Sequence, residues 1–170
     1  RLLMKKNILF ILPYLPWPLV SGGHQALFNG IDCLKEDFNI FVAFYSDGAP
    51  NPVAVEEFKK RIPNTTLFFM DTSYRASSFV VRVINKIQRI LTKQVKKLSC
   101  IDRNELNYLW LYTNSPQPAK WQQFIHDICE KYKIDIVQVE MPWISSFILS
   151  LPDTVRKVYV HHELAFVRHA

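Results

Sequence analysis

Residues 7–37 of the chain have the sequence NILFILPYLPWPLVSGGHQALFNGIDCLKED, and this stretch decides the fold. Its first part is an apolar run that ends at a proline, which is the pattern of a short buried strand. An amphipathic segment, residues 24–37, follows Gly22 and Gly23 directly and predicts a helix. Two adjacent glycines ahead of a helix leave backbone N–H groups uncovered at the positive end of the helix dipole, so a phosphate or diphosphate can approach them. The alternative interpretation is that the pair only forms a tight turn.

The rest of the chain alternates between apolar strands and amphipathic helices. The predicted strands are residues 38–44, 65–71, 134–140 and 155–160. The predicted helices are residues 53–62, 77–98, 102–112, 119–133 and 142–151. Strands rich in Ile, Val and Phe that alternate with helices predict an α/β fold with a Rossmann-like, doubly wound and mostly parallel sheet. At 170 residues and 49% hydrophobic composition, the chain is expected to form one domain, residues 1–170.

Ligands of such sheets bind beyond the carboxyl ends of the strands. Several polar residues follow predicted strands and are therefore expected along one edge of the sheet. They are Ser21, Gly22, Gly23, Asp47, Asp71, Glu140, His161, His162 and Glu163.

Cysteine usage and missing motifs exclude several classes of protein. The three cysteines, Cys33, Cys100 and Cys129, are odd in number and widely spaced, which argues against a disulfide framework or a zinc site and favours a reducing compartment. We expect all three to be buried thiols. The sequence lacks GxGxxG, GxxxxGK[ST], GxSxG and HExxH motifs. His161, His162 and Glu163 are adjacent, so they alternate in direction on an extended chain, and no metal site is expected.

The chain contains no apolar run near the roughly 18–20 residues that span a bilayer. Residues 1–12 resemble a signal peptide in having basic residues ahead of an apolar run. Prolines interrupt that run, however, and no small-residue cleavage site follows. The sequence therefore predicts a cytoplasmic protein.

The stretch between Asp71 and Asp102 has seven basic and no acidic residues, against a net charge of +6 for the whole chain. The basic residues are Arg75, Arg82, Lys86, Arg89, Lys93, Lys96 and Lys97. Five of them recur at spacings of 4, 3, 4 and 3, which places them on one face of a helix. Such a face suits the inner surface of an anionic membrane or a polyanionic acceptor, and the alternative is an ordinary solvated surface. Nucleic acid is not expected as a partner, because aromatic residues do not interleave with the basic ones.

The segment ILFILPYLPWPLVSGGHQALFNGIDCL (8–34) is similar to the opening of the group 1, or family 4, glycosyltransferases. Their N-terminal domains have a strand, a proline-containing loop with two glycines, and a helix in this order. KYKIDIVQVEMPW (131–143) resembles the family's later strand and loop. KVYVHHELAFVR (157–168) resembles the segment in which a strand ends in a histidine, often with an acidic residue and an arginine after it.

This resemblance implies the N-terminal half of a GT-B fold, in which two Rossmann-like domains face each other across a cleft. The N-terminal half mainly binds the acceptor. The C-terminal half holds most of the nucleotide-sugar donor and a pair of glutamates seven residues apart, which this sequence lacks. We therefore expect the donor-binding domain to be absent from the chain and the isolated chain to be inactive.

The complete enzyme would transfer a sugar from a nucleotide-diphosphate donor to a hydroxyl of a glycan, a lipid-linked acceptor or a cell-surface polysaccharide. The family implies retention of anomeric configuration with no metal or other cofactor. A different class remains open, namely a non-catalytic Rossmann-like module that docks to an anionic membrane or a partner protein.

The resemblance also implies roles for individual residues. Gly22 and Gly23 would lie against the donor diphosphate, and a catalytic histidine after the fifth strand would contact the acceptor or the transferring sugar. Both His161 and His162 fit that position. His162 is preferred, because with Glu163 and Arg168 it resembles the family's histidine, acid and arginine spacing.

Acceptor binding is assigned to His24, Glu140, Trp143, Glu163 and Arg168. Glu140 would accept hydrogen bonds from acceptor hydroxyls, unless it is only a solvated strand-end residue or pairs with Lys133. Trp143, like Tyr14 and Trp17, offers an aromatic face on which a sugar can stack, although loop packing explains these rings equally well.

Overall fold

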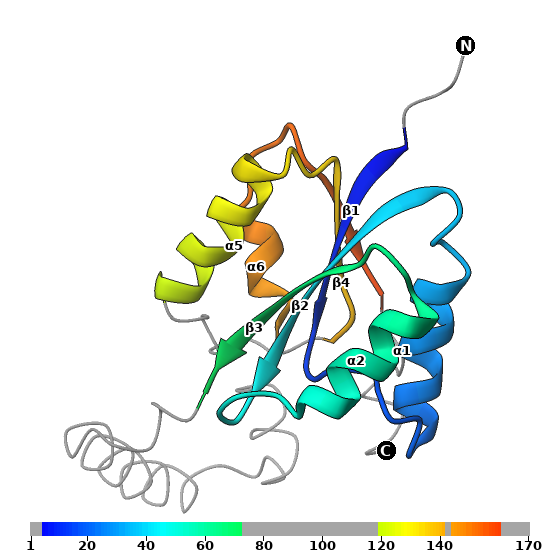
Figure 1. Ribbon diagram of the computed structural model, residues 1–170. Coiled ribbons are helices and arrows are strands. Elements are labelled where there is room, and N and C mark those ends of the chain that lie inside the picture. The colour runs from blue at the N-terminus through cyan, green and yellow to red at the C-terminus, as the bar shows by residue number, and fades with distance from the viewer. Residues whose placement is uncertain (1–4, 73–118, 142–143, 161–170) are drawn as a thin grey trace, which may run out of the picture.

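The computed structural model describes residues 5–72, 119–141 and 144–160 of the chain (Figure 1). The elements are β1 (Lys6–Leu12), α1 (Gly22–Asp32), β2 (Phe38–Ser46), α2 (Pro52–Arg61), β3 (Thr66–Asp71), α5 (Ala119–Lys131), β4 (Ile136–Val139), α6 (Ser146–Leu149) and β5 (Arg156–Tyr159). They form one five-stranded, all-parallel sheet with helices on both faces. The predicted α/β, Rossmann-like, doubly wound fold is therefore confirmed.

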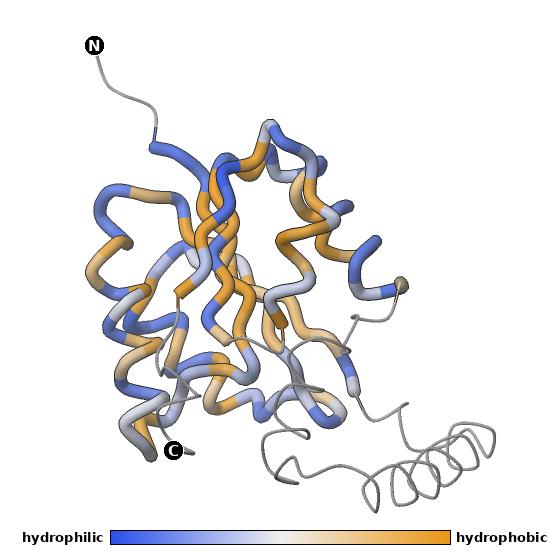
Figure 2. The backbone as a smooth tube through the Cα atoms, turned by 180° about the vertical axis from the view of Figure 1, so that it is seen from behind, coloured by the Kyte–Doolittle hydropathy of each residue, from blue (hydrophilic) through white to orange (hydrophobic). Residues whose placement is uncertain are grey.

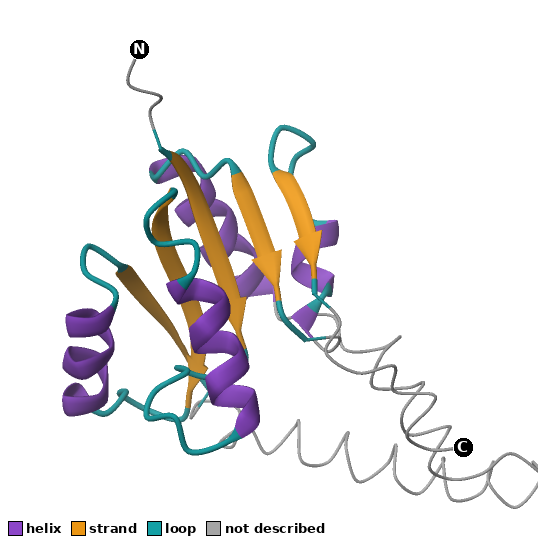
Figure 3. Ribbon diagram, turned by 90° about the vertical axis from the view of Figure 1, so that its right-hand side faces the viewer, coloured by secondary structure: helices purple, strands orange, loops and turns teal. Residues whose placement is uncertain are grey.

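The first strand of the chain lies at the centre of the sheet. The strand order is β3-β2-β1-β4-β5, so the chain moves outward from β1 in one direction and then returns to continue on its other side. β1 pairs with β2 along its whole length, from Lys6 opposite Phe38 to Leu12 opposite Phe44. On its other edge, β1 pairs with β4, and Ile11 lies opposite Val139. Figure 3 shows the parallel arrangement, with the strand arrowheads at the same edge of the sheet.

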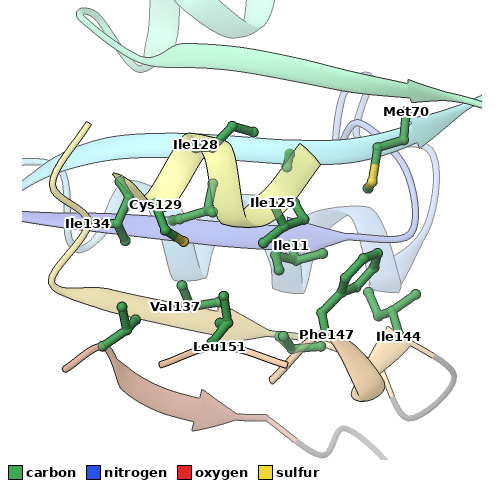
Figure 4. Close-up of a cluster of buried hydrophobic side chains, with 14 residues drawn as sticks. Ile11, Met70, Ile125, Ile128, Cys129, Ile134, Val137, Ile144, Phe147 and Leu151 are labelled. Carbon is green, nitrogen blue, oxygen red and sulfur yellow. The ribbon is translucent and has the colours of Figure 1, made fainter. Parts of the chain in front are cut away.

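Alternate residues of β1 contribute to two separate apolar cores, one on each face of the sheet. In Figure 2 the strands at the centre of the molecule are coloured mostly as hydrophobic. Ile8, Phe10 and Leu12 belong to the core under α1 and α2. Leu9 and Ile11 belong to the core under α5 and α6, part of which is drawn in Figure 4. Because this central strand is buried on both faces, its sequence from Ile8 to Leu12 is continuously apolar instead of alternating with polar residues.

An asparagine closes the amino edge of the sheet, opposite the edge where ligands bind in such folds. The Asn7 side-chain amide donates to the carbonyl oxygen of Tyr132 at 2.7 Å and accepts from the Asn39 amide at 2.8 Å. The Asn7 backbone N–H donates to Asp135 Oδ2 at 2.8 Å. One residue therefore connects the starts of β1, β2 and β4.

The main difference between predicted and observed elements lies in α1. The sequence predicted a helix over residues 24–37, whereas the helix begins at Gly22 and ends at Asp32. It begins earlier because the Ser21 side chain accepts from the His24 N–H and caps the first turn. It ends earlier because tight turns follow, in which Asp37 donates its N–H to Leu34. The two glycines are thus the first residues of the helix and do not precede it.

The other observed strands and helices match the predicted ones to within a few residues, except that α6 (Ser146–Leu149) is much shorter than the predicted 142–151. The predicted helices over residues 77–98 and 102–112 lie outside the described residues. In the described ranges, no helix combines the length and the apolar character needed to cross a bilayer.

The cysteines do not behave alike. Cys129 is buried in the core under α5, as predicted. Cys33 is exposed, so the prediction that it is buried was wrong; it follows α1, and its thiol donates to the Gly30 carbonyl oxygen at 3.2 Å. Cys33 lies off the helix face that Leu27 and Ile31 bury. Cys100 lies outside the described residues.

Burial of Cys129 makes the stability of the fold sensitive to alkaline pH. Desolvation raises the pKa of this thiol from 9.0 to about 11. Between these values the unfolded chain loses the thiol proton while the folded chain keeps it, so unfolding is increasingly favoured as pH rises. We expect the free energy of unfolding to fall by up to about 1.4 kcal/mol per pH unit in this range.

Urea unfolding of the wild type and of Cys129→Ala across that pH range measures this contribution. The substitution should remove it, while the contributions of tyrosines and lysines stay in both proteins. Equal pH slopes for the two proteins would contradict the burial of the thiol.

Candidate functional site

The carboxyl edge of the sheet, between β1 and β4, is the candidate site. The chain leaves β1 toward α1 on one face and leaves β4 toward α6 on the other, so the two connections diverge here. In doubly wound sheets this switch point is where ligands bind. Ser21 and the two glycines follow β1 at this edge, and Glu140 follows β4.

The first turn of α1 presents uncovered backbone N–H groups at the switch point. Ser21 has extended backbone angles, and its Oγ accepts the N–H of His24 at 3.3 Å. In the described part of the chain, no protein group accepts the N–H of Gly22 or Gly23. These two groups lie at the positive end of an eleven-residue helix. An anion placed there would receive both hydrogen bonds and a favourable interaction with the helix dipole.

Tyr14 and His24 form a stacked pair beside these glycines. Their ring centroids lie 4.4 Å apart with an angle of 24° between the planes. His24 Nδ1 lies 2.8 Å from Ser21 Oγ, so the imidazole is held by stacking on one side and by a hydrogen bond at its edge. A Cβ on Gly23 would lie only 2.8 Å from Tyr14 Oη, whereas a Cβ on Gly22 would meet nothing within 4 Å. A side chain at the second glycine would therefore displace the Tyr14 hydroxyl group, whereas one at the first would displace nothing.

Glu140 is the only buried charged side chain in the described residues, with 5% of its surface exposed. Gln138 Nε2 donates a short hydrogen bond to Glu140 Oε1. The solvated alternative for Glu140 is thus wrong. A salt bridge to Lys133 is also excluded by position, because Lys133 precedes β4 at the opposite edge of the sheet.

The two aspartates at this edge differ in role. Asp71 ends β3, and its Oδ1 accepts the N–H of Gly48 at 3.1 Å. Gly48 has a φ of 81°, a left-handed conformation that favours glycine, so Asp71 fixes the tight turn after β2. Asp47 lies in that turn and is exposed.

Trp17 is used for packing. Its ring lies 5.5 Å from the ring of Phe28 on α1, and the Arg61 guanidinium carbon lies 4.2 Å from its centroid. These two contacts hold the loop between β1 and α1 against α1 and α2.

The contacts of Gln138 and Tyr14 were not predicted from the sequence. The sequence did contain a signal for the contact between Gln138 and Glu140. Gln138 is polar in an otherwise apolar strand, and it shares a face with Glu140 because residues i and i+2 of a strand point the same way. No signal in the sequence indicated the proximity of Tyr14 to Gly23, because it depends on the path of the intervening loop.

The remaining candidates lie outside the described residues. They are His161, His162, Glu163, Arg168, Trp143, Arg82, Lys86, Arg89, Lys93, Lys96 and Lys97. The described chain reaches this edge at Val160, whose N–H donates to the carbonyl oxygen of Val139 at 2.9 Å. Within the described ranges, no three histidine, cysteine or acidic side chains lie close enough together to hold a metal ion.

No protein-family model matches the chain, and a search of curated proteins finds no match either.

Proposed function

We propose that this chain is the acceptor-side, N-terminal domain of a GT-B glycosyltransferase that transfers a sugar from a nucleotide-diphosphate donor to a hydroxyl. The observation that carries the proposal is the pair of uncovered N–H groups of Gly22 and Gly23, which open α1 directly behind the central strand. A diphosphate is the ligand group that suits such a helix start at a switch point.

Two further features support the proposal. The buried Glu140 carboxyl group lies at the same edge and suits the recognition of hydroxyl groups, which donate hydrogen bonds to it. The motifs that resemble those of group 1 glycosyltransferases lie in residues 8–34, 131–143 and 157–168. In this proposal, the neighbouring domain would hold the nucleotide, and this chain would hold the acceptor and one side of the diphosphate.

The test is a donor screen on the complete gene product. A panel of nucleotide sugars is incubated with neutral glycosides and lipid-linked acceptors, and the release of nucleoside diphosphate is measured with and without a chelator. We expect release that depends on the acceptor and is unaffected by chelation. A gene product without a second Rossmann-like domain containing two glutamates seven residues apart, or without transfer to any acceptor, would overturn the proposal.

The second candidate function is a module that docks to an anionic membrane. The seven basic residues between Asp71 and Asp102 favour it, because they exceed the net charge of the whole chain. Sedimentation with vesicles containing phosphatidylserine tests it. Binding that disappears when Arg82, Lys86, Arg89 and Lys93 are replaced by glutamine, together with an absence of transfer, would favour this function over the transferase.

A further inference from the structure

The hydroxyl group of Tyr14 lies against the first turn of α1, but the fold makes no use of it. A Cβ on Gly23 would lie only 2.8 Å from Tyr14 Oη, so the hydroxyl is close to the backbone of this turn. In the described part of the chain, no group is hydrogen-bonded to the hydroxyl. A phenylalanine at this position would keep the stacking on His24 and leave more room at Gly23. The hydroxyl therefore has no structural reason within the fold, which suggests contact with a ligand.

The position of Tyr14 Oη places it beside the uncovered N–H groups of the same turn. The Cα–Cβ bond of a helical residue is tilted toward the N-terminus of the helix. The free N–H groups of a first turn point in that direction as well. Because Tyr14 Oη lies against the Cβ position of Gly23, it flanks the end of the helix at which the N–H groups of Gly22 and Gly23 are uncovered. The hydroxyl and the two N–H groups are thus three hydrogen-bond donors around one region.

These donors are accessible, and the hydroxyl is held in place. Gly22 is exposed, and Tyr14 and Gly23 are partly exposed. The Tyr14 ring stacks on His24 with the centroids 4.4 Å apart, and His24 Nδ1 lies 2.8 Å from Ser21 Oγ. The orientation of the phenol is therefore set before a ligand arrives, and less ordering is required on binding.

We propose that Tyr14 Oη donates a hydrogen bond to the diphosphate of the nucleotide sugar, next to the N–H groups of Gly22 and Gly23. This inference rests on the proposed transferase function. Hydrogen bonds to a charged oxygen are stronger than those between neutral groups, so one hydroxyl makes a measurable contribution. Tyr14 is then a phosphate-binding residue, and the ring face that His24 covers does not receive a sugar.

The experiment compares the wild type with Tyr14→Phe in the complete gene product. The variant keeps the ring and removes only the hydroxyl. We expect the KM for the nucleotide sugar to rise about 10-fold or more, as loss of one hydrogen bond to a charged group implies. The KM for the acceptor and the free energy of unfolding should stay unchanged. Inorganic pyrophosphate, used as a competitive inhibitor, should lose affinity by the same factor, because it carries the diphosphate without the nucleoside or the sugar.

Tyr132→Phe is the matched control. Tyr132 follows α5 at the amino edge of the sheet, where its carbonyl oxygen accepts from the Asn7 amide, so it lies away from the first turn of α1. Its ring contacts those of Phe41 and Phe68. Removal of its hydroxyl should leave the KM for the nucleotide sugar and the inhibition by pyrophosphate unchanged.

An unchanged KM for the nucleotide sugar in Tyr14→Phe would overturn the inference and leave the transferase function standing. The same holds if that KM rises while inhibition by pyrophosphate is unaffected, since the hydroxyl would then contact another part of the donor. A wild type that transfers no sugar from any donor would overturn both the inference and the proposed function.

Discussion

Gly23→Ala is expected to lower kcat/KM of the proposed transferase by about 10- to 100-fold, because a methyl group there would disturb both the proposed diphosphate contact and the adjacent Tyr14. The new Cβ would lie 2.8 Å from Tyr14 Oη. Tyr14 stacks on His24 at 4.4 Å, so a shift of its hydroxyl group away from the new methyl group would disturb this stacking. We therefore also expect a loss of roughly 1–2 kcal/mol in the free energy of unfolding. Steady-state kinetics and urea unfolding measure the two effects.

Two control variants separate packing from ligand binding. Gly22→Ala meets no atom within 4 Å and should leave the free energy of unfolding within about 0.5 kcal/mol of the wild type. The double variant Tyr14→Phe/Gly23→Ala removes the hydroxyl that the new methyl group meets, so it should regain stability. If the bare Gly23 backbone binds the diphosphate, the double variant stays poorly active. Recovery of both stability and activity would show that Gly23 serves only to accommodate Tyr14.

Phe147→Ala is expected to cost about 3–5 kcal/mol in the free energy of unfolding, the usual loss for a fully buried phenylalanine. Phe147 is 0% exposed and comes from the one-turn helix α6 (Figure 4). It packs into the core under α5 and α6 with Ile11 of β1 and Val139 of β4. Since a domain is stable by only about 5–15 kcal/mol, this single change removes a large part of the total.

Leu149→Ala is the control within the same helix. Leu149 is 85% exposed, so its truncation should change the free energy of unfolding by less than about 0.5 kcal/mol. Chemical denaturation of both variants measures the difference. Similar losses for the two would mean that α6 contributes through its backbone and not through the Phe147 ring.

The apolar runs of the sequence were sufficient to predict the strands. NILFIL is apolar on both sides of the chain, and this continuous pattern correctly indicated a strand buried on two faces. The parallel sheet followed from the alternation of such runs with helices. Parallel strands all end at the same edge of the sheet. The sequence therefore also predicted that the glycine pair and Glu140, which follow β1 and β4, lie at this carboxyl edge.

Contacts between distant side chains could not be predicted in this way. Hydrophobic periodicity placed the start of α1 at His24, whereas the Ser21 side chain caps the helix three residues earlier. The stacking of Tyr14 on His24 depends on how the proline-rich loop folds back, which no spacing rule describes. The burial of Glu140 depends on its neighbours in three dimensions, and a strand-end glutamate in a sequence gives no indication of them.

The central position of β1 has a consequence for the order in which the protein is made. Asn7 and Asp135, whose backbones join β1 to the start of β4, are 128 residues apart in the chain. At the usual 5–20 residues per second, a ribosome needs roughly 6–25 s to add this length. During that interval the edge of β1 that later pairs with β4 lacks this partner, and such an edge can pair with other chains. Slow translation between β3 and β4, or the absence of a chaperone, should therefore reduce the yield of folded protein more than any single substitution at the surface.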